Sequence, residues 1–90
     1  MLTEEQRELA RHALGLGNGR KQSYRNRFAT GPGGTDHPAW LDMVKQGFAK
    51  KRDGKTLPFG GDDMFWLTRR GATLALDAGE TLDTEDFPDA

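Results

Sequence analysis

The sequence predicts an α+β fold with three helices and a small antiparallel sheet of two or three strands. Two amphipathic segments with helix-start signals, residues 3–16 and 35–47, flank a glycine-rich stretch. A basic run with an Asp-Gly turn then leads to a short apolar stretch, residues 64–67, as is typical of a hairpin. Ninety residues make one domain at most, so these elements are expected to share one thin core. Its expected aromatic anchors are Tyr24, Phe28, Trp40, Phe48, Phe59, Phe65 and Trp66.

The first helix is expected to begin at a capping box formed by Thr3 and Gln6. Glu4 and Glu5 follow at the positive end of the helix dipole, where acidic side chains stabilise a helix. An apolar stripe with helical spacing comes next, made of Leu9, Ala10, Ala13 and Leu14. Gly15 and the glycines after it are expected to end the helix.

A short strand is expected over residues 24–28, where Tyr24 and Phe28 share one side and Arg25 and Arg27 share the other. The Gly-Pro-Gly-Gly run that follows it is typical of a loop.

The second helix is expected to begin near residues 35–38, because a capping residue there precedes Pro38 in the first turn. Its apolar face is made of Trp40, Met43, Val44 and Phe48. Gly47 is expected to end the helix, and Trp40 is expected to be buried against the first helix.

The next elements are a hairpin and a third helix. The basic run of residues 50–55 surrounds an Asp-Gly turn, and residues 64–67 are expected to pair with the segment that starts at Phe48. Thr68 is then expected to cap a third helix that ends before Gly79.

Charge is unevenly distributed along the chain, although the overall net charge is −1. Residues 11–76 contain twelve Lys and Arg against five Asp, a net charge of +7, whereas residues 77–90 contain six acidic residues and no basic one. A basic body with an acidic tail is typical of nucleic-acid binding in which the tail competes for the basic surface. The alternative is that the tail only increases solubility.

The expected organisation is therefore a domain of residues 1–78 followed by an acidic tail of residues 79–90. The tail is expected to fold loosely back toward the body or to stay mobile, with order only where Leu82 and Phe87 dock. On this hypothesis, truncation after the domain leaves the fold intact.

Eight basic residues are the candidate nucleic-acid-binding residues: Arg25, Arg27, Lys50, Lys51, Arg52, Lys55, Arg69 and Arg70. The first two alternate with aromatic residues, an arrangement that suits phosphate contacts and base stacking. The alternative buries the aromatic rings and leaves both arginines in solvent. The four basic residues of the hairpin are expected to contact a nucleic-acid backbone, or else to solubilise an edge of the sheet.

Arg69 and Arg70 occupy the first turn of the third helix, where positive charge opposes the helix dipole. A bound anion would relieve this conflict, and so would a nearby acid such as Asp62 or Asp63.

No residue pattern indicates catalysis, a cofactor or a metal site. Neither Asp53 with the Asp62–Asp63 pair nor the two histidines show a known ligand spacing, and the chain has no cysteine. The glycine-rich loop lacks the Lys-Ser/Thr of a phosphate-binding loop. The absence of cysteine, of a signal peptide and of a long apolar run predicts a cytoplasmic protein without a membrane partner.

Residues 39–76 resemble the back half of a winged-helix domain, as found in MarR-like repressors. The resemblance is carried by a helix ending in glycine, a basic hairpin, and a strand whose Leu67-Thr68-Arg69-Arg70-Gly71 opens a helix. It implies DNA binding, with the hairpin as the wing. The front half departs from this pattern, because residues 24–34 are glycine-rich and aromatic where the family has the first helix of its helix-turn-helix.

The whole chain is also similar to small uncharacterised proteins encoded by phages and prophages, through residues 10–16, 24–28 and 60–68. This resemblance implies a phage or prophage accessory protein, which the basic body suggests binds nucleic acid without sequence specificity. The alternative is a non-catalytic protein-interaction module that meets a host or phage protein in phage–host interplay or virion assembly.

Overall fold

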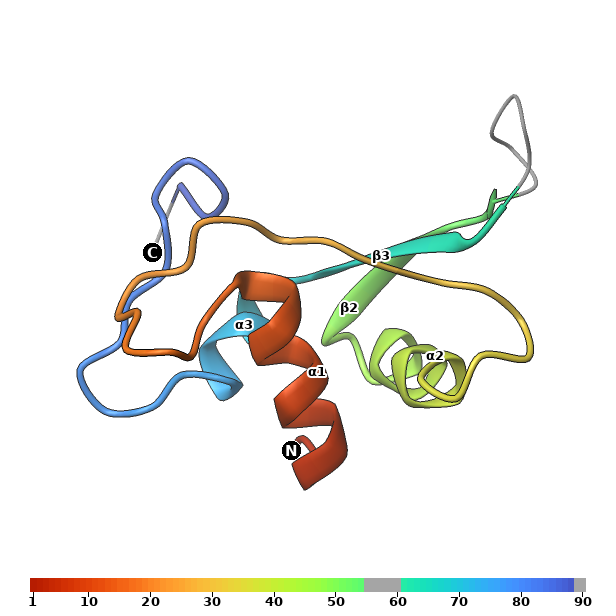
Figure 1. Ribbon diagram of the computed structural model, residues 1–90, viewed down its shortest axis with the longest axis horizontal. Helices are drawn as coiled ribbons and strands as arrows, with labels where there is room; N and C mark the ends of the chain where they lie inside the picture. The colour runs from red at the N-terminus through yellow and green to blue at the C-terminus, as the bar shows by residue number, and fades with distance from the viewer. Residues whose placement is uncertain (55–60, 89–90) are drawn as a thin grey trace.

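The fold places three helices against a three-stranded antiparallel sheet in the computed structural model, which describes residues 1–54 and 61–88 (Figure 1). In chain order the elements are α1 (Glu4–Leu14), β1 (Phe28–Thr30), α2 (His37–Lys45), β2 (Ala49–Arg52), β3 (Asp63–Leu67) and α3 (Arg69–Leu74). The strand order is β1-β3-β2, so β3 is central. Figure 1 shows the helices on one side of the sheet, which leaves its other face without a helix.

The expected α+β class is thus confirmed, and α1 begins as its sequence predicts. The Thr3 hydroxyl accepts a hydrogen bond from the Gln6 N–H, and the Gln6 side chain accepts one from the Thr3 N–H, both at 3.0 Å. Gly15 ends the helix in the left-handed conformation, with φ of 76°.

The expected hairpin is also confirmed in the described residues, since β2 and β3 are antiparallel with Ala49 opposite Leu67 and Arg52 opposite Met64. Residues 55–60, including Lys55, lie outside the described residues.

The first strand lies later than expected, at residues 28–30 instead of 24–28. The reason is that the preceding segment bonds to the end of α1, with the Tyr24 N–H donating to the Leu14 carbonyl at 3.1 Å. Opposite Leu67, the side chain of Asn26 takes the place of a strand backbone. Its amide donates to the Leu67 carbonyl at 2.9 Å and accepts from the Leu67 N–H at 2.8 Å.

The start of α3 is built from the predicted cap and a close backbone approach. The Thr68 hydroxyl accepts from the Gly71 N–H at 3.2 Å and donates to the Gly47 carbonyl at 2.8 Å. A Cβ at Gly71 would lie 2.0 Å from the Phe48 carbonyl oxygen, so only glycine fits between α3 and the start of β2. The helix ends at Leu74, before Gly79 as expected.

The core lies between the helices and the covered face of the sheet. Its largest fully buried apolar side chains are Trp40, Phe48, Phe65, Leu14, Met43 and Leu67. Trp40 is fully buried as predicted, and its ring stacks on Phe65 with centroids 5.4 Å apart. Two other expected anchors lie elsewhere, because Tyr24 is 49% exposed and Trp66 is only half-buried.

The C-terminal segment, residues 79–88, packs against the rest of the chain. The expected docking of Leu82 and Phe87 is confirmed, whereas the expectation that the segment is otherwise loosely attached is corrected. Leu82 and Phe87 belong to the hydrophobic core. The segment also pairs with residues 21–23, because the Ser23 N–H donates to the Thr81 carbonyl at 3.0 Å. The buried Ser23 hydroxyl accepts from the Asp83 N–H at 2.8 Å. These contacts join residues about sixty positions apart in the sequence, so no local pattern predicts them.

The winged-helix resemblance is not confirmed. Within the described residues the chain has one helix, α2, between β1 and β2, where a winged helix has a helix-turn-helix.

None of the helices formed by residues 1–54 and 61–88 has the length and apolar character needed to cross a membrane.

Candidate nucleic-acid interface

The sheet face without helices carries a group of basic and apolar side chains. Side chains alternate between faces along a strand, and the inward residues of β3 are Asp63, Phe65 and Leu67, all buried. Met64 and Trp66 therefore point outward, opposite Arg52 and Lys50 of β2. On β1, Ala29 lies opposite Met64, and by alternation Arg27 is on the same side. We call this surface the open face; its residues are Arg27, Ala29, Lys50, Arg52, Met64 and Trp66.

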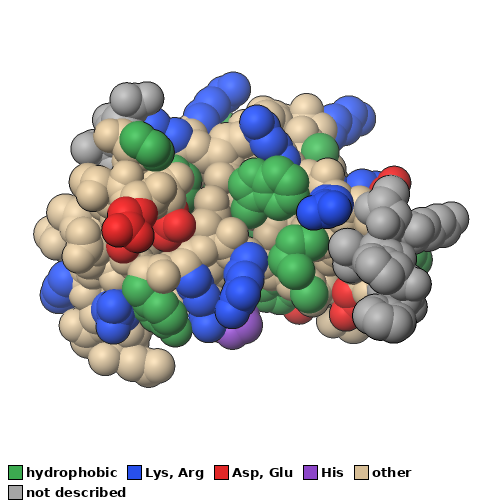
Figure 2. All heavy atoms as spheres, turned by 90° about the horizontal axis from the view of Figure 1, so that it is seen from above, with side chains coloured by type: hydrophobic (Ala, Val, Ile, Leu, Met, Phe, Trp, Pro, Cys, Tyr) green, Lys and Arg blue, Asp and Glu red, His purple; other side chains and the backbone are tan. Residues whose placement is uncertain are grey.

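Figure 2 looks onto this side of the molecule and shows hydrophobic side chains in the middle with Lys and Arg side chains around them. The three basic residues of the open face are exposed, and none makes an ion pair with a residue that the structure describes. Arg69 adds a fourth exposed cation, since it lines a surface hollow together with Lys50 and Trp66. These side chains are thus available to an external anion.

The other predicted cations are placed differently. Lys51 lies on the same side of the sheet as Phe65, its partner across the strands, and forms an ion pair with Asp53 at 3.0 Å. The hydrogen bond to Asp53 raises the pKa of Lys51 above its ordinary value. Arg70 lies over the Phe48 ring, 5.0 Å from its centroid. Neither residue belongs to the open face.

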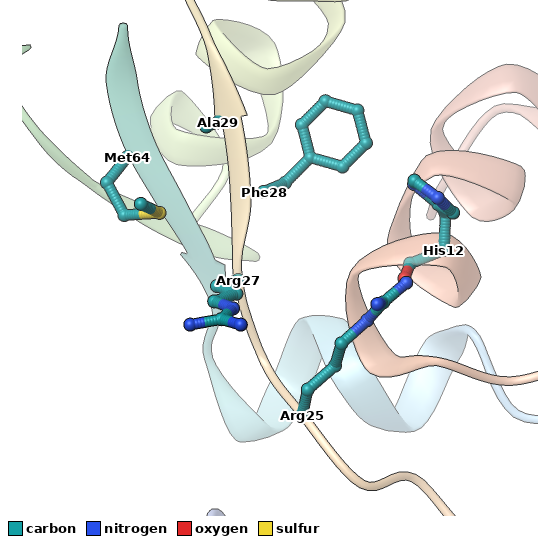
Figure 3. A pocket seen from close by; sticks show the side chains of 6 residues that line it. All are labelled: His12, Arg25, Arg27, Phe28, Ala29 and Met64. Atoms are coloured by element: carbon teal, nitrogen blue, oxygen red, sulfur yellow. The ribbon is translucent and has the colours of Figure 1, made fainter. Parts of the chain in front are cut away.

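Arg25 forms hydrogen bonds with α1. Its guanidinium donates to the His12 carbonyl at 2.8 Å, near the end of α1, where a cation is favourable for the helix dipole. Figure 3 shows Arg25 reaching toward α1, whereas Arg27 and Met64 lie on the side of β1 away from the Phe28 ring. The two arginines of the predicted segment therefore separate, and only Arg27 faces outward.

Tyr24 is 49% exposed but does not belong to the open face. Its ring covers Gly15, where a Cβ would lie 2.1 Å from Tyr24 Cε1. The guanidinium groups of Arg20 and Arg25 lie 4.2 and 5.3 Å from the ring centroid.

The aromatic residue that does lie among the cations is Trp66, one of the expected core anchors. The sequence does not indicate that Trp66 faces outward, because residues 64–67 are all apolar and show no alternation of polar and apolar side chains. Only the register with Lys50 and Arg52 shows which two of them face outward.

Acidic side chains border the open face at one end. Asp86 of the C-terminal segment lines the hollow that contains Lys50 and Arg69, without forming an ion pair within the described residues. Figure 2 shows acidic side chains gathered at the end of the molecule where the C-terminal segment lies. An acidic neighbour of this kind repels a polyanion from that end of the surface.

Asp63 lies at the other end of β3 from Arg69 and Arg70, so it does not neutralise them as one hypothesis held. It forms a buried pair with His37, Nε2 to Oδ2 at 2.8 Å, and accepts from the Gly54 N–H at 2.8 Å. The Gly54 hydrogen bond, followed by the His37 bond, lowers the pKa of Asp63. This pair ties α2 to the hairpin.

Within residues 1–54 and 61–88, no cluster of three or more His, Asp or Glu side chains is arranged to hold a metal ion.

Comparison of the chain with protein-family models, curated proteins and solved structures found no match.

Proposed function

We propose that this chain is a cytoplasmic phage or prophage accessory protein that binds nucleic acid through the open face, without catalysis and with little sequence specificity. The phage setting rests on the sequence resemblance alone. The observation that supports nucleic-acid binding is the group of exposed cations, Arg27, Lys50, Arg52 and Arg69, around an apolar centre. Each contact between such a cation and a phosphate releases counterions, which gives affinity independent of base sequence.

Low sequence specificity follows from the shape of the surface. A helix or a two-stranded ribbon enters the major groove and contacts base edges, whereas a three-stranded sheet presents a broad face. The hairpin expected to act as a wing has Lys51 on the covered side, and only Lys50 and Arg52 of its described basic residues face outward.

The experiment is a fluorescence-anisotropy titration of labelled, unrelated oligonucleotides at several salt concentrations. The parent is expected to bind all of them at low salt, with an affinity that falls linearly with salt on logarithmic axes. Replacing both Lys50 and Arg52 with Gln should weaken binding to each sequence alike and reduce the slope by roughly 0.7–0.9 per lost contact.

The matched control is Lys45→Gln, an exposed cation at the end of α2 on the helix side of the sheet. This variant should bind like the parent. Absence of binding at low salt by the folded parent would refute the proposal.

A second candidate function, docking of a protein partner, is favoured by one specific surface. Met1 and Leu74, which are 95% and 42% exposed, line an apolar hollow with Phe48, and Arg69 and Arg70 lie at its rim. Such a surface suits an apolar side chain of a partner with acidic residues around it. If the oligonucleotide titrations fail, this hollow becomes the leading site.

A further inference from the structure

We infer that the ligand of the open face is single-stranded nucleic acid, with one unpaired base stacked on Trp66. The inference rests on the proposed function and goes beyond it by naming the form of nucleic acid and the side chain that contacts the base.

Trp66 lies at the centre of the open face, with a cation on each side. It is on the middle strand, directly opposite Lys50 of β2, and Arg27 occupies the neighbouring position on the β1 side. Directly opposite residues in an antiparallel sheet have Cβ atoms about 4.5–5.5 Å apart. A base lying on the indole would thus have its flanking phosphates within reach of long basic side chains.

The Trp66 ring has no partner among the described residues, in contrast to the other tryptophan. The Trp40 ring stacks on Phe65 and also contacts Phe28, with centroids 5.4 and 5.2 Å apart, and is fully buried. Trp66 is half-buried, and neither its ring nor its indole N–H interacts with another ring, cation or acceptor that the structure describes. A partly exposed aromatic ring between cations is an arrangement by which proteins hold unpaired bases.

A duplex cannot use this arrangement. Its bases are stacked on each other and expose only their edges in the grooves, so the indole face meets no base. The cations would still contact the phosphates of a duplex, but without the contribution from stacking. An acidic protein segment, like a duplex, would form ion pairs with the cations but would not provide a planar group to stack on the ring. The combination of a partly exposed ring and flanking cations therefore favours an unpaired strand.

The test compares a thymidine oligonucleotide of about twelve nucleotides with the same sequence in a duplex, at equal salt. The parent should bind the single strand at least about tenfold more tightly. Trp66→Leu should weaken single-strand binding by about tenfold to one-hundredfold, leave duplex binding nearly unchanged and leave the salt slope unchanged. Trp66→Phe, which keeps a stacking ring, should retain most of the affinity.

Intrinsic fluorescence supplies a second readout that a general loss of structure would not reproduce. In the parent, the single strand should quench part of the tryptophan emission. In Trp66→Phe the remaining emission comes from buried Trp40, so the same strand should bind without quenching it.

The outcomes separate the two proposals. Equal affinity for both forms, with Trp66→Leu neutral, would overturn the stacking inference and leave binding through phosphates standing. No binding of either form by the folded parent at low salt would overturn both.

Discussion

Glu80 in the C-terminal segment forms a two-pronged ion pair with Arg11 of α1, at N–O distances of 2.5 and 2.7 Å. Only 4% of the Glu80 side chain is exposed, and the carboxylate also accepts from the Asp77 N–H at 2.7 Å. The Arg11 hydrogen bonds, opposed by burial, lower the pKa of Glu80 from 4.5 to about 2. This contact fastens the last part of the domain to the first helix.

Glu80 should make the fold sensitive to acid. Its pKa is lower in the folded than in the unfolded state, so its contribution to stability is complete above about pH 4.5 and is lost as the pH falls toward about 2. Asp63 acts in the same direction, because its pKa is also lowered. Glu80→Gln should reduce the free energy of unfolding at neutral pH by roughly 1–3 kcal/mol and reduce the loss on acidification.

Urea denaturation at several pH values checks this prediction, with Glu85→Gln as the exposed control. If the free energy of unfolding of the parent and of Glu80→Gln changed in parallel with pH, the Glu80–Arg11 ion pair would not be responsible for the acid sensitivity.

Truncation after Ala78 should unfold the domain or destabilise it severely. It removes two buried apolar side chains, Leu82 and Phe87, each contributing roughly 1.5–3 kcal/mol, in addition to the Glu80 ion pair. The total free energy of unfolding of a domain is only about 5–15 kcal/mol. Circular dichroism during thermal denaturation measures the effect, and Thr84→Ala, an exposed change in the same segment, should be neutral. If the truncated protein melted like the parent, the C-terminal segment would not contribute to the stability of the fold.

Gly71→Ala should be costly even though alanine is the better helix former. The added methyl group would meet the Phe48 carbonyl at 2.0 Å, so α3 must move away from β2. We expect a loss of roughly 1–3 kcal/mol, as for other overpacked sites. Thr73→Ala, at an exposed position of the same helix, is the matched control and should be neutral or slightly stabilising. A stable Gly71→Ala variant would contradict this packing.

Asp86→Asn should strengthen nucleic-acid binding. Asp86 lines the hollow with Lys50 and Arg69, so removing its charge lowers the repulsion of phosphates. The gain should be a few-fold at low salt and vanish at high salt, since screening acts on exposed charges. Glu8→Gln, an equal charge change on α1, should have no effect. A gain with both variants would indicate a response to net charge alone.

The sequence was most informative where structure depends on neighbouring residues. The capping box of Thr3 and Gln6 and the proline in the first turn of α2 are signals within a few positions of the helix starts that they predict. The strand of residues 64–67 pairs with the strand that precedes it in the chain. The first strand was misplaced because its start depends on Asn26 bonding to Leu67, forty-one positions away. The docking of the C-terminal segment likewise depends on Ser23 and Arg11, which no local pattern relates to it.

In the candidate site, too, the sequence identifies the residues but not the contacts that orient them. The basic residues were identified from composition, but their separation into an outward and a covered set requires the strand register. Lys51 lies between Lys50 and Arg52 in the sequence and on the opposite side of the sheet. Trp66 was assigned to the core because nothing in an apolar run indicates which side chains face outward.

The most direct test of binding through the open face is amide chemical-shift mapping by NMR, with a single-stranded oligonucleotide added to the folded protein at low salt. The predicted result is a set of shifts in the outward residues of the three strands and in the Trp66 indole N–H, while the buried Trp40 indole stays unchanged. Shifts confined to the hollow around Met1 and Leu74, or no shifts at all, would contradict the account.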